Sequence, residues 1–371
     1  MTGQAIDSRE SLSRLNDAAR RLQREVRYME VCGTHTVNAF RSGLHSLMPP
    51  NVTLLSGPGC PVCVTSQGDI DQLIELSLQS GVIMCTYGDM IRVTGQRGSL
   101  EEARALGADV RIVYSALDAV RLAAAEPRRQ VIFAGVGFET TAPATAVAIL
   151  EADRLALMNF TVFVSHKLII PAMQALLKSE VNIDGFVCPG HVSVVIGSDA
   201  FRPIVEQYWL SCVITGFEGP QIAAALARLC ELTLSGQAAL ENLYPQAVTS
   251  TGNQHAWKLI EQVFTPANVH WRGLSELPGS GLEIRGRYAR FNARVRYELA
   301  AADNREPPGC RCGEVITGRC TPADCKLFGT VCTPIQPIGP CMVSSEGTCQ
   351  AWFKYRPRNR AQSPTPIRSA V

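Results

Sequence analysis

The stretch VIFAGVGFETTAPATAVAIL, residues 131–150, contains the repeating unit from which this fold is predicted to be built. Its first four residues, 131–134, are all apolar, as expected of a buried strand, and helical periodicity without strong breakers follows over residues 144–155. A strand, a glycine-containing turn and a helix in this order are typical of parallel sheets with right-handed crossovers. The sequence therefore predicts an α/β fold.

The same alternation continues on both sides of this stretch. Strands are predicted at residues 52–55, 82–85, 110–113, 131–134, 161–164, 185–187 and 213–214. Helices are predicted at residues 70–78, 100–106, 116–125, 144–155, 170–178 and 220–232, after an amphipathic helix at 9–27. Two smaller sheets are favoured over one large sheet, because the polar segment PRRQ at 127–130 interrupts the run near its middle.

These patterns predict five consecutive parts of the chain. They are an N-terminal helix at 1–28, a first α/β domain at 29–128, a second at 129–240, a cysteine-rich domain at 241–356 and a flexible tail at 357–371. Beyond residue 240, segments such as 279–287 and 307–340 are rich in Gly, Pro or Cys and show little periodicity, so we expect irregular structure there.

Composition narrows the class of protein. The 371 residues are 46% apolar and 18% charged, and 35 basic against 33 acidic residues give a net charge of +2. This balance gives no electrostatic reason to expect nucleic acid or a membrane surface as a partner. No apolar run approaches the roughly 20 residues of a membrane helix, and the charged N-terminus has no apolar core of a secretory signal. We therefore expect a cytoplasmic protein.

The 14 cysteines are distributed unevenly. Half of them lie in one block of 40 residues, at positions 310, 312, 320, 325, 332, 341 and 349. In a reducing compartment such clustering indicates metal ligands or redox-active thiols. An iron–sulfur cluster is favoured over a structural zinc site, because the spacings do not pair into two C-x₂₋₄-C halves.

Two further thiol motifs lie near the N-terminus. A polar group without cysteine, Tyr87-Gly-Asp89, also follows a predicted strand. Cys32 precedes His35 by three residues, so that thiolate and imidazole could share one side of a turn and bind a first-row metal; the alternative is a buried cysteine beside a surface histidine. Cys60 and Cys63 form a C-x-x-C pair after a glycine-rich turn, which suits a reversible disulfide, a metal chelate or simple packing in a tight turn.

Two polar residues follow later strands. Gly135-x-Gly137 precedes Glu139, but the spacing matches neither common nucleotide-binding loop, so a phosphate cradle is weakly indicated and Glu139 is instead expected to face a cleft. His191 follows Cys188 by three residues, and a histidine at such a position is more often hydrogen-bonded structurally than used as a ligand.

Six of these stretches together resemble the HypD family of nickel–iron hydrogenase maturation factors. They are MEVCGTHT (29–36), SGPGCPVCVT (56–65), GFETTAP (137–143), CPGHVSVVIG (188–197), CRCGEVITG (310–318) and DCKLFGTVCTPIQPIGPCMVSSEGTC (324–349). The resemblance covers about residues 10–355. It departs from the family in the Arg- and Pro-rich tail and in the additional Cys320.

The resemblance implies two similar α/β domains facing a cleft, and a third domain that carries a 4Fe–4S cluster. The family's spacing C-x₁₄-C-x₆-C-x₁₆-C falls on Cys310, Cys325, Cys332 and Cys349, and leaves Cys312, Cys320 and Cys341 as non-ligands. It also implies functional roles for the motifs that contain Cys32, His35, Cys60 and Cys63, with Cys32 as a ligand of a cargo iron. Glu139, His35 and His191 would orient ligands or handle protons.

The implied function is assembly of an Fe(CN)₂CO unit in a complex with the small chaperone HypC. Cyanide would come from the partner HypE, and the finished unit would pass to the hydrogenase large subunit. Two other functions are compatible with the residues: an iron–sulfur thiol-disulfide oxidoreductase without iron cargo, and a zinc-stabilised interaction module. Iron beyond four atoms per chain would indicate the assembly function rather than the oxidoreductase, and bound zinc would indicate the interaction module.

Overall fold

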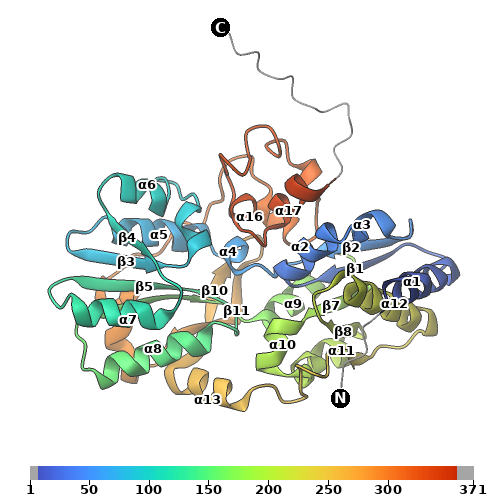
Figure 1. Ribbon diagram of the computed structural model, residues 1–371, viewed down its shortest axis with the longest axis horizontal. Coiled ribbons are helices and arrows are strands. Elements are labelled where there is room, and N and C mark those ends of the chain that lie inside the picture. The colour runs from blue at the N-terminus through green and yellow to red at the C-terminus, as the bar shows by residue number, and fades with distance from the viewer. Residues whose placement is uncertain (1–6, 357–371) are drawn as a thin grey trace, which may run out of the picture.

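The structure is a computed structural model that describes residues 7–356, and it consists of two parallel sheets, their helices and an irregular C-terminal region (Figure 1). All seven predicted strands and all six predicted helices of the alternating run are present. The predicted α/β class with a cysteine-rich C-terminal region is therefore confirmed. The predicted tail, 357–371, lies outside the described residues.

The first sheet has five parallel strands in the order β2-β1-β7-β8-β9. Its strands are β1 (Val26–Glu30), β2 (Val52–Ser56), β7 (Gly185–Pro189), β8 (Ser211–Thr215) and β9 (Leu240–Asn242). Its principal helices are α1 (Ser8–Arg21), α2 (Gly33–Arg41), α3 (Leu44–Leu47), α10 (Gly190–Ile196), α11 (Arg202–Tyr208) and α12 (Gly219–Ser235).

Strand β1 was not predicted, because the sequence indicated a single helix at 9–27. The helix ends instead at Arg21, and after four intervening residues the chain enters the sheet between β2 and β7. The sequence of β1, VRYME, is short and has neither a continuous apolar run nor a regular alternation, and only the pairing on both sides makes it a strand.

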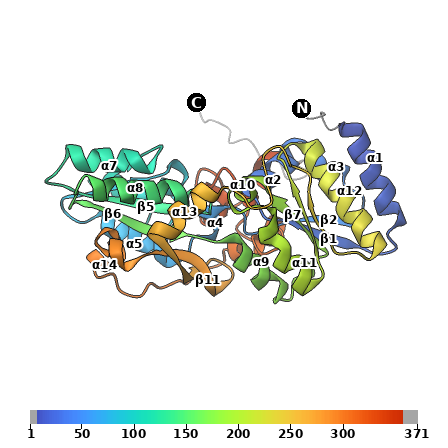
Figure 2. The same ribbon diagram turned by 90° about the horizontal axis from the view of Figure 1, so that it is seen from below.

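The second sheet has four parallel strands in the order β4-β3-β5-β6. They are β3 (Val82–Thr86), β4 (Asp109–Ile112), β5 (Gln130–Gly137) and β6 (Phe160–His166). Its helices are α5 (Gln67–Ser77), α6 (Leu100–Ala105), α7 (Ala116–Ala125) and α8 (Ala142–Arg154), with the short 3₁₀ helix η1 (Gly88–Arg92) after β3. Helix α9 (Ile169–Leu177) leads from β6 back to the first sheet, where it lies near β7 and α11 (Figure 2).

Both faces of this second sheet are buried. Ile83 and Phe133 pack with α7 and α8, whereas Met84 and Ile132 belong to the cluster that includes α5. Figure 2 shows α7 and α8 on one side of β5 and β6, and α5 on the other. Burial on both faces explains why these strands are continuously apolar in the sequence.

The predicted domain boundary at residues 128/129 does not separate the two sheets. The chain makes β1 and β2, leaves to complete the entire second sheet, and then returns to make β7, β8 and β9. The polar segment 127–130 lies inside the second sheet, because β5 begins at Gln130 and pairs with β3. A polar turn between a helix and a strand therefore has the same composition as a domain linker, and only the strand pairing distinguishes them.

After β9 the chain forms α13 (Gln254–Val263) and an antiparallel hairpin of β10 (Phe264–Trp271) and β11 (Ser275–Ile284). The expectation of irregular structure at 279–287 is therefore wrong in its first half. The strand was missed because Pro278 and two glycines interrupt its pattern and its burial does not alternate. Isolated bridges join the hairpin to Thr65 and to Lys167, so it links the two halves of the molecule.

The remaining C-terminal region has only short elements. They are η3 (Gly286–Phe291), α14 (Ala293–Arg296), α15 (Cys312–Val315), η4 (Pro322–Asp324), α16 (Pro340–Val343) and α17 (Thr348–Tyr355). Figure 1 shows α16 and α17 next to α4 (Pro61–Val64), which lies centrally between the sheets. Within residues 7–356, no helix has the length and apolar character needed to cross a membrane.

Candidate functional site

Both sheets reverse their strand order at one point. In the first sheet the reversal lies between β1 and β7, and in the second between β3 and β5. Ligands of open α/β sheets bind beyond the carboxyl ends of the strands at such points. The predicted site residues follow these strand ends: Cys32 and His191 in the first sheet, Asp89 and Glu139 in the second.

Cys32 is the residue before the first turn of α2, and its side chain is buried, with 7% of the residue exposed. Its backbone N–H donates to Glu30 Oε2 at 2.8 Å, and the Thr36 hydroxyl donates to the other carboxylate oxygen. Burial raises the pKa of the Cys32 thiol to about 12 and that of the Glu30 carboxyl to about 8. At neutral pH both groups are therefore protonated in the chain by itself.

His35 lies one turn further along α2 and is fully buried. Its Nε2 is 2.9 Å from the carbonyl oxygen of Gly216, and a carbonyl can only accept, so Nε2 carries the proton. Burial lowers the pKa of His35 to about 4, which keeps the ring neutral. Nδ1 is then a buried acceptor without a hydrogen-bond partner.

His191 belongs to the same edge of the sheet but is exposed. Its ring stacks on Phe217 with 3.8 Å between centroids, and the ring of His35 lies 5.1 Å from the same phenyl group. The structure therefore brings the two predicted histidines together around Phe217, which follows β8.

The loop after β2 packs directly against the Cys32 loop. The N–H of Gly33 donates to the carbonyl of Gly59 at 3.2 Å. A Cβ atom on Gly59 would lie 2.1 Å from the backbone nitrogen of Cys32, so only glycine fits at this position. The next residue, Cys60, forms a disulfide with Cys63 across α4, and both sulfurs are buried.

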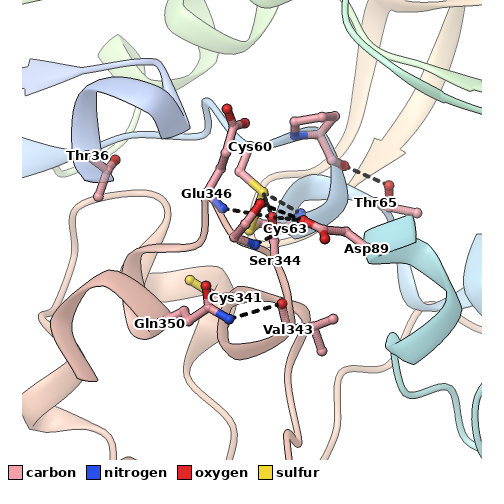
Figure 3. Close-up of a disulfide and its surroundings, with 12 residues drawn as sticks. Thr36, Cys60, Cys63, Thr65, Asp89, Cys341, Val343, Ser344, Glu346 and Gln350 are labelled. Carbon is pink, nitrogen blue, oxygen red and sulfur yellow. Dashed lines mark hydrogen bonds between the residues drawn. A yellow bond between two sulfur atoms is a disulfide. The ribbon is translucent and has the colours of Figure 1, made fainter. Parts of the chain in front are cut away.

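The C-terminal region completes this junction through the turn Ser344–Glu346, which follows α16 (Figure 3). Ser344 Oγ lies 3.3 Å from Cys60 Sγ, and the Thr34 hydroxyl donates to Glu346 Oε1 at 2.6 Å. Asp89, after β3, accepts from the backbone N–H of Ser345 at 2.9 Å. One turn therefore contacts the Cys32 loop, the disulfide and the second sheet.

A second thiol-rich site lies directly behind this turn. Six cysteines line one small cavity together with Val315, Leu327, Phe328 and Met342; they are Cys310, Cys312, Cys325, Cys332, Cys341 and Cys349. All four cysteines of the family spacing are among them. Cys312 and Cys341, predicted as non-ligands, share the cavity, whereas Cys320 lines a separate hollow beside Trp352.

The donor set of this cavity suits an iron–sulfur cluster. Contact with Cys312, and then burial, raises the pKa of Cys310, and burial raises the pKa of Cys332. These thiols are therefore neutral in the chain by itself, and a bound metal would replace their protons. Backbone N–H groups point at sulfur, as in the bonds from Ile338 to Cys332 at 3.3 Å and from Cys349 to Cys341 at 3.1 Å. Across residues 7–356, no three His, Cys, Asp or Glu side chains are grouped to hold one metal ion.

Glu139 lies apart from these thiols in the second half of the molecule. Its Oε1 accepts from the N–H of Ile169 at 2.9 Å, whereas the buried Oε2 has no partner. Burial raises its pKa to about 7. With 2% of the residue exposed, Glu139 is inside the protein.

Sequence reasoning missed Glu30, Ser344, Glu346 and the fully buried Arg272. Glu30 could have been found, because it lies two residues before Cys32 in the conspicuous stretch MEVCGTHT. The other three come from segments without periodicity, where only the tertiary structure shows what they contact.

The fold and the two sites define an α/β protein with a thiol junction between two parallel sheets and a cysteine cavity beside it. A family profile named HypD, described as the hydrogenase formation hypA family, matches residues 7–356. The chain belongs to this family.

Characterised relatives are similar over almost their full lengths. The "Hydrogenase maturation factor HypD" of Azotobacter vinelandii is 46% identical over 347 residues, which cover 91% of this chain and 92% of the relative. The protein of the same name from Escherichia coli (strain K12) is 43% identical over 94% of this chain and 93% of its own length. The "Hydrogenase expression/formation protein HupD" of Azotobacter chroococcum mcd 1 is 45% identical over 91% of each chain.

Proposed function

We propose that this chain is a cytoplasmic hydrogenase maturation factor that acts as an assembly scaffold. With a HypC-type chaperone it would hold an iron that receives one carbonyl and two cyanide ligands, the cyanide coming from a HypE-type partner. The names of the relatives support the general role. The observation that carries the finer proposal is the convergence of Cys32, the Cys60–Cys63 disulfide and the Ser344–Glu346 turn at one junction.

Cys32 would bind the substrate iron as a thiolate. Burial holds its pKa near 12, so the thiol gives up its proton only when a cation takes the proton's place. The neutral Glu30 beneath it adds no negative charge at pH 7, and the free Nδ1 of His35 offers a further acceptor or ligand. Soft thiolate ligation suits iron that carries cyanide and carbonyl. A thiolate of the chaperone would supply another ligand.

The cysteine cavity would hold a 4Fe–4S cluster through Cys310, Cys325, Cys332 and Cys349. When bound, the cluster supplies single electrons at a potential that its surroundings tune. Helix α16 connects the cavity to the disulfide: Cys341 lines the cavity, and Ser344 ends the helix beside Cys60.

The disulfide would act as a two-electron relay. Two electrons and two protons convert the Cys60–Cys63 bond into two thiols, and oxidation returns both electrons. Ser344 Oγ is within hydrogen-bond distance both of Cys60 Sγ and of Asp89 Oδ2, at 3.3 Å each. Reduction of the disulfide would therefore change the contacts of Ser344, which belongs to the turn that contacts the Cys32 loop.

A thiol-disulfide oxidoreductase without iron cargo is the second candidate, and the buried disulfide beside the cysteine cavity favours it. It would use the same cluster and the same relay. It assigns no role to Cys32, His35 and His191.

Infrared spectroscopy of the chain co-purified with its small chaperone tests the proposal. The scaffold function predicts cyanide and carbonyl stretching bands, and more than four iron atoms per chain. Four irons without these bands would support the oxidoreductase instead, and a colourless protein containing zinc would exclude both functions.

A further inference from the structure

Arg272 is an arginine with almost no access to solvent, placed between α4, the helix at the disulfide, and the cysteine cavity. It follows β10, is 1% exposed, and is the second-largest of the fully buried side chains in the described residues. Only one carboxylate in residues 7–356 comes within 4.0 Å of its guanidinium: Glu306, whose Oε2 is 4.0 Å from Nη1. A buried charge with so distant a counter-ion is costly unless another anion is present.

One side of the guanidinium is held against the disulfide segment. Nε donates to the carbonyl of Thr65 at 3.2 Å and Nη2 to Gln67 Oε1 at 3.1 Å, while the backbone N–H donates to Val64 at the end of α4. Nη1 is buried and has no hydrogen-bond partner. The side chain is therefore fixed in place, with one donor group unused.

The other side of the residue faces the cysteine-rich segment. Gly273 packs against the backbone of Gly313, the residue after Cys312. Glu306 is engaged at the same contact, accepting from the N–H groups of Gly273 at 3.1 Å and Gly313 at 3.3 Å. The charge of Arg272 is close enough to act on both Cys310 and Cys312.

We infer that Arg272 is the internal counter-cation of the cysteine cavity and raises the reduction potential of the cluster held there. This inference rests on the proposed 4Fe–4S cluster. Four thiolates give such a cluster a net negative charge, and reduction adds one more electron. A buried cation nearby stabilises the reduced form more than the oxidised form, because charge interactions are weakly screened inside a protein. Arg272 is a positioning residue, because it would act through the cluster.

The test is a spectroelectrochemical titration of the purified holoprotein, with iron and sulfide content measured beside it. In Arg272→Met the ratio of reduced to oxidised cluster at a fixed potential should fall by about tenfold, a shift of about 59 mV for a one-electron couple. Glu306→Gln removes the nearby negative charge, so its potential should move in the opposite direction. Arg272→Lys keeps the charge and should restore most of the wild-type potential.

Arg319→Met is the matched control. Arg319 donates to the carbonyl of Gly273 at 2.6 Å, close to Arg272, but it is exposed, so solvent and salt should screen its charge and leave the potential unchanged. A purely structural role for Arg272 would lower cluster content without opposite shifts in the Met and Gln variants.

Three results are decisive. An unshifted potential in Arg272→Met, with full cluster content, overturns the inference and leaves the proposed function intact. If Arg272→Met does not fold, Glu306→Gln decides, and an unchanged or lower potential in that variant overturns the inference. A wild-type protein without any iron–sulfur cluster contradicts the proposed function itself.

Discussion

The two parallel sheets share one topological plan and differ in the chemistry at the point where their strand order reverses. In the first sheet the loops after β1 and β7 carry Cys32 and His191, a soft ligand and an imidazole. In the second sheet the loops after β3 and β5 carry Asp89 and Glu139, two carboxyl groups. The loops at the two reversal points therefore carry different functional groups.

The difference shows that the strand order determines where a site lies and that the loop residues determine its chemistry. The thiol edge contacts both the disulfide loop and the C-terminal turn, as expected of a site that receives a metal. The carboxyl edge holds that turn in position through Asp89, whereas Glu139 is buried away from the thiols and bonded to Ile169. We therefore expect changes at the first edge to abolish function, and changes at the second mainly to alter stability.

The largest effect is expected for Cys32→Ala. Loss of the Cys32 thiol should abolish hydrogenase maturation and remove the cyanide and carbonyl bands, because the proposed thiolate ligand of the cargo iron is then missing. The 4Fe–4S absorbance should persist, since the cavity cysteines lie in another part of the chain. Infrared and visible spectra of one sample check both statements; simultaneous loss of both signals would mean that Cys32 is structural.

Replacement of Cys332 by Ala should bleach the cluster and destabilise the C-terminal region without altering either sheet. Cys320→Ala is the control, because Cys320 lines a different hollow beside Trp352, and it should leave iron and sulfide content unchanged. Iron content per chain is the measurement. A normal cluster in the Cys332 variant would refute the ligand assignment.

Cys60→Ala and Cys63→Ala should each fold and retain the cluster yet fail to support maturation, because one sulfur alone cannot close the disulfide. Hydrogenase activity in cells carrying each variant, beside thiol titration with and without reductant, measures this. If the pair only packs a turn, each variant should lose about 1–2 kcal/mol of stability and keep maturation. Full activity from either variant argues against the relay.

Glu139→Gln tests whether the carboxyl edge acts on stability. The folded pKa of about 7 lies above the unfolded value of 4.5, so the wild-type protein loses stability as pH rises from about 4.5 through 7. The Gln variant keeps the bond from Ile169 and carries no charge, so it should be more stable by about 3 kcal/mol above pH 8 and equal below pH 4.5. Urea midpoints at pH 4.5 and 8.5 measure the difference.

The same variant sharpens the comparison of the two edges. Glu139 was predicted from the sequence as a site residue that orients ligands or handles protons. If Glu139→Gln folds with increased stability but maturation is lost, Glu139 takes part in the chemistry, and the second edge is more than a support.

The smallest effect is expected for Asp89→Ala. It removes the acceptor of the Ser345 N–H and hydroxyl, which should cost about 1–2 kcal/mol and loosen the turn over the disulfide. Asp199→Ala, in an exposed pair with Arg202, is the control and should change stability by less than about 0.5 kcal/mol. Equal effects of the two variants would remove Asp89 from the junction.

The sequence by itself determined seven of the nine parallel strands of residues 7–356, six of the helices that accompany them and the six motifs that carry the chemistry. These features depend on local information: apolar runs such as those of β3 and β5 are buried on both faces, and glycine turns follow the strands. The concentration of cysteines after residue 310 was equally visible without any structure.

Only the tertiary structure decided how these pieces combine. It assigned β1 and β2 to one sheet with β7, against the predicted boundary at 128/129, because strand pairing depends on contacts between residues far apart in the chain. It also placed Ser344 beside Cys60, Cys312 and Cys341 inside the cysteine cavity, and Arg272 between the two sites. Spacing along the chain carries no record of such contacts, because they form only when separate loops pack against one another.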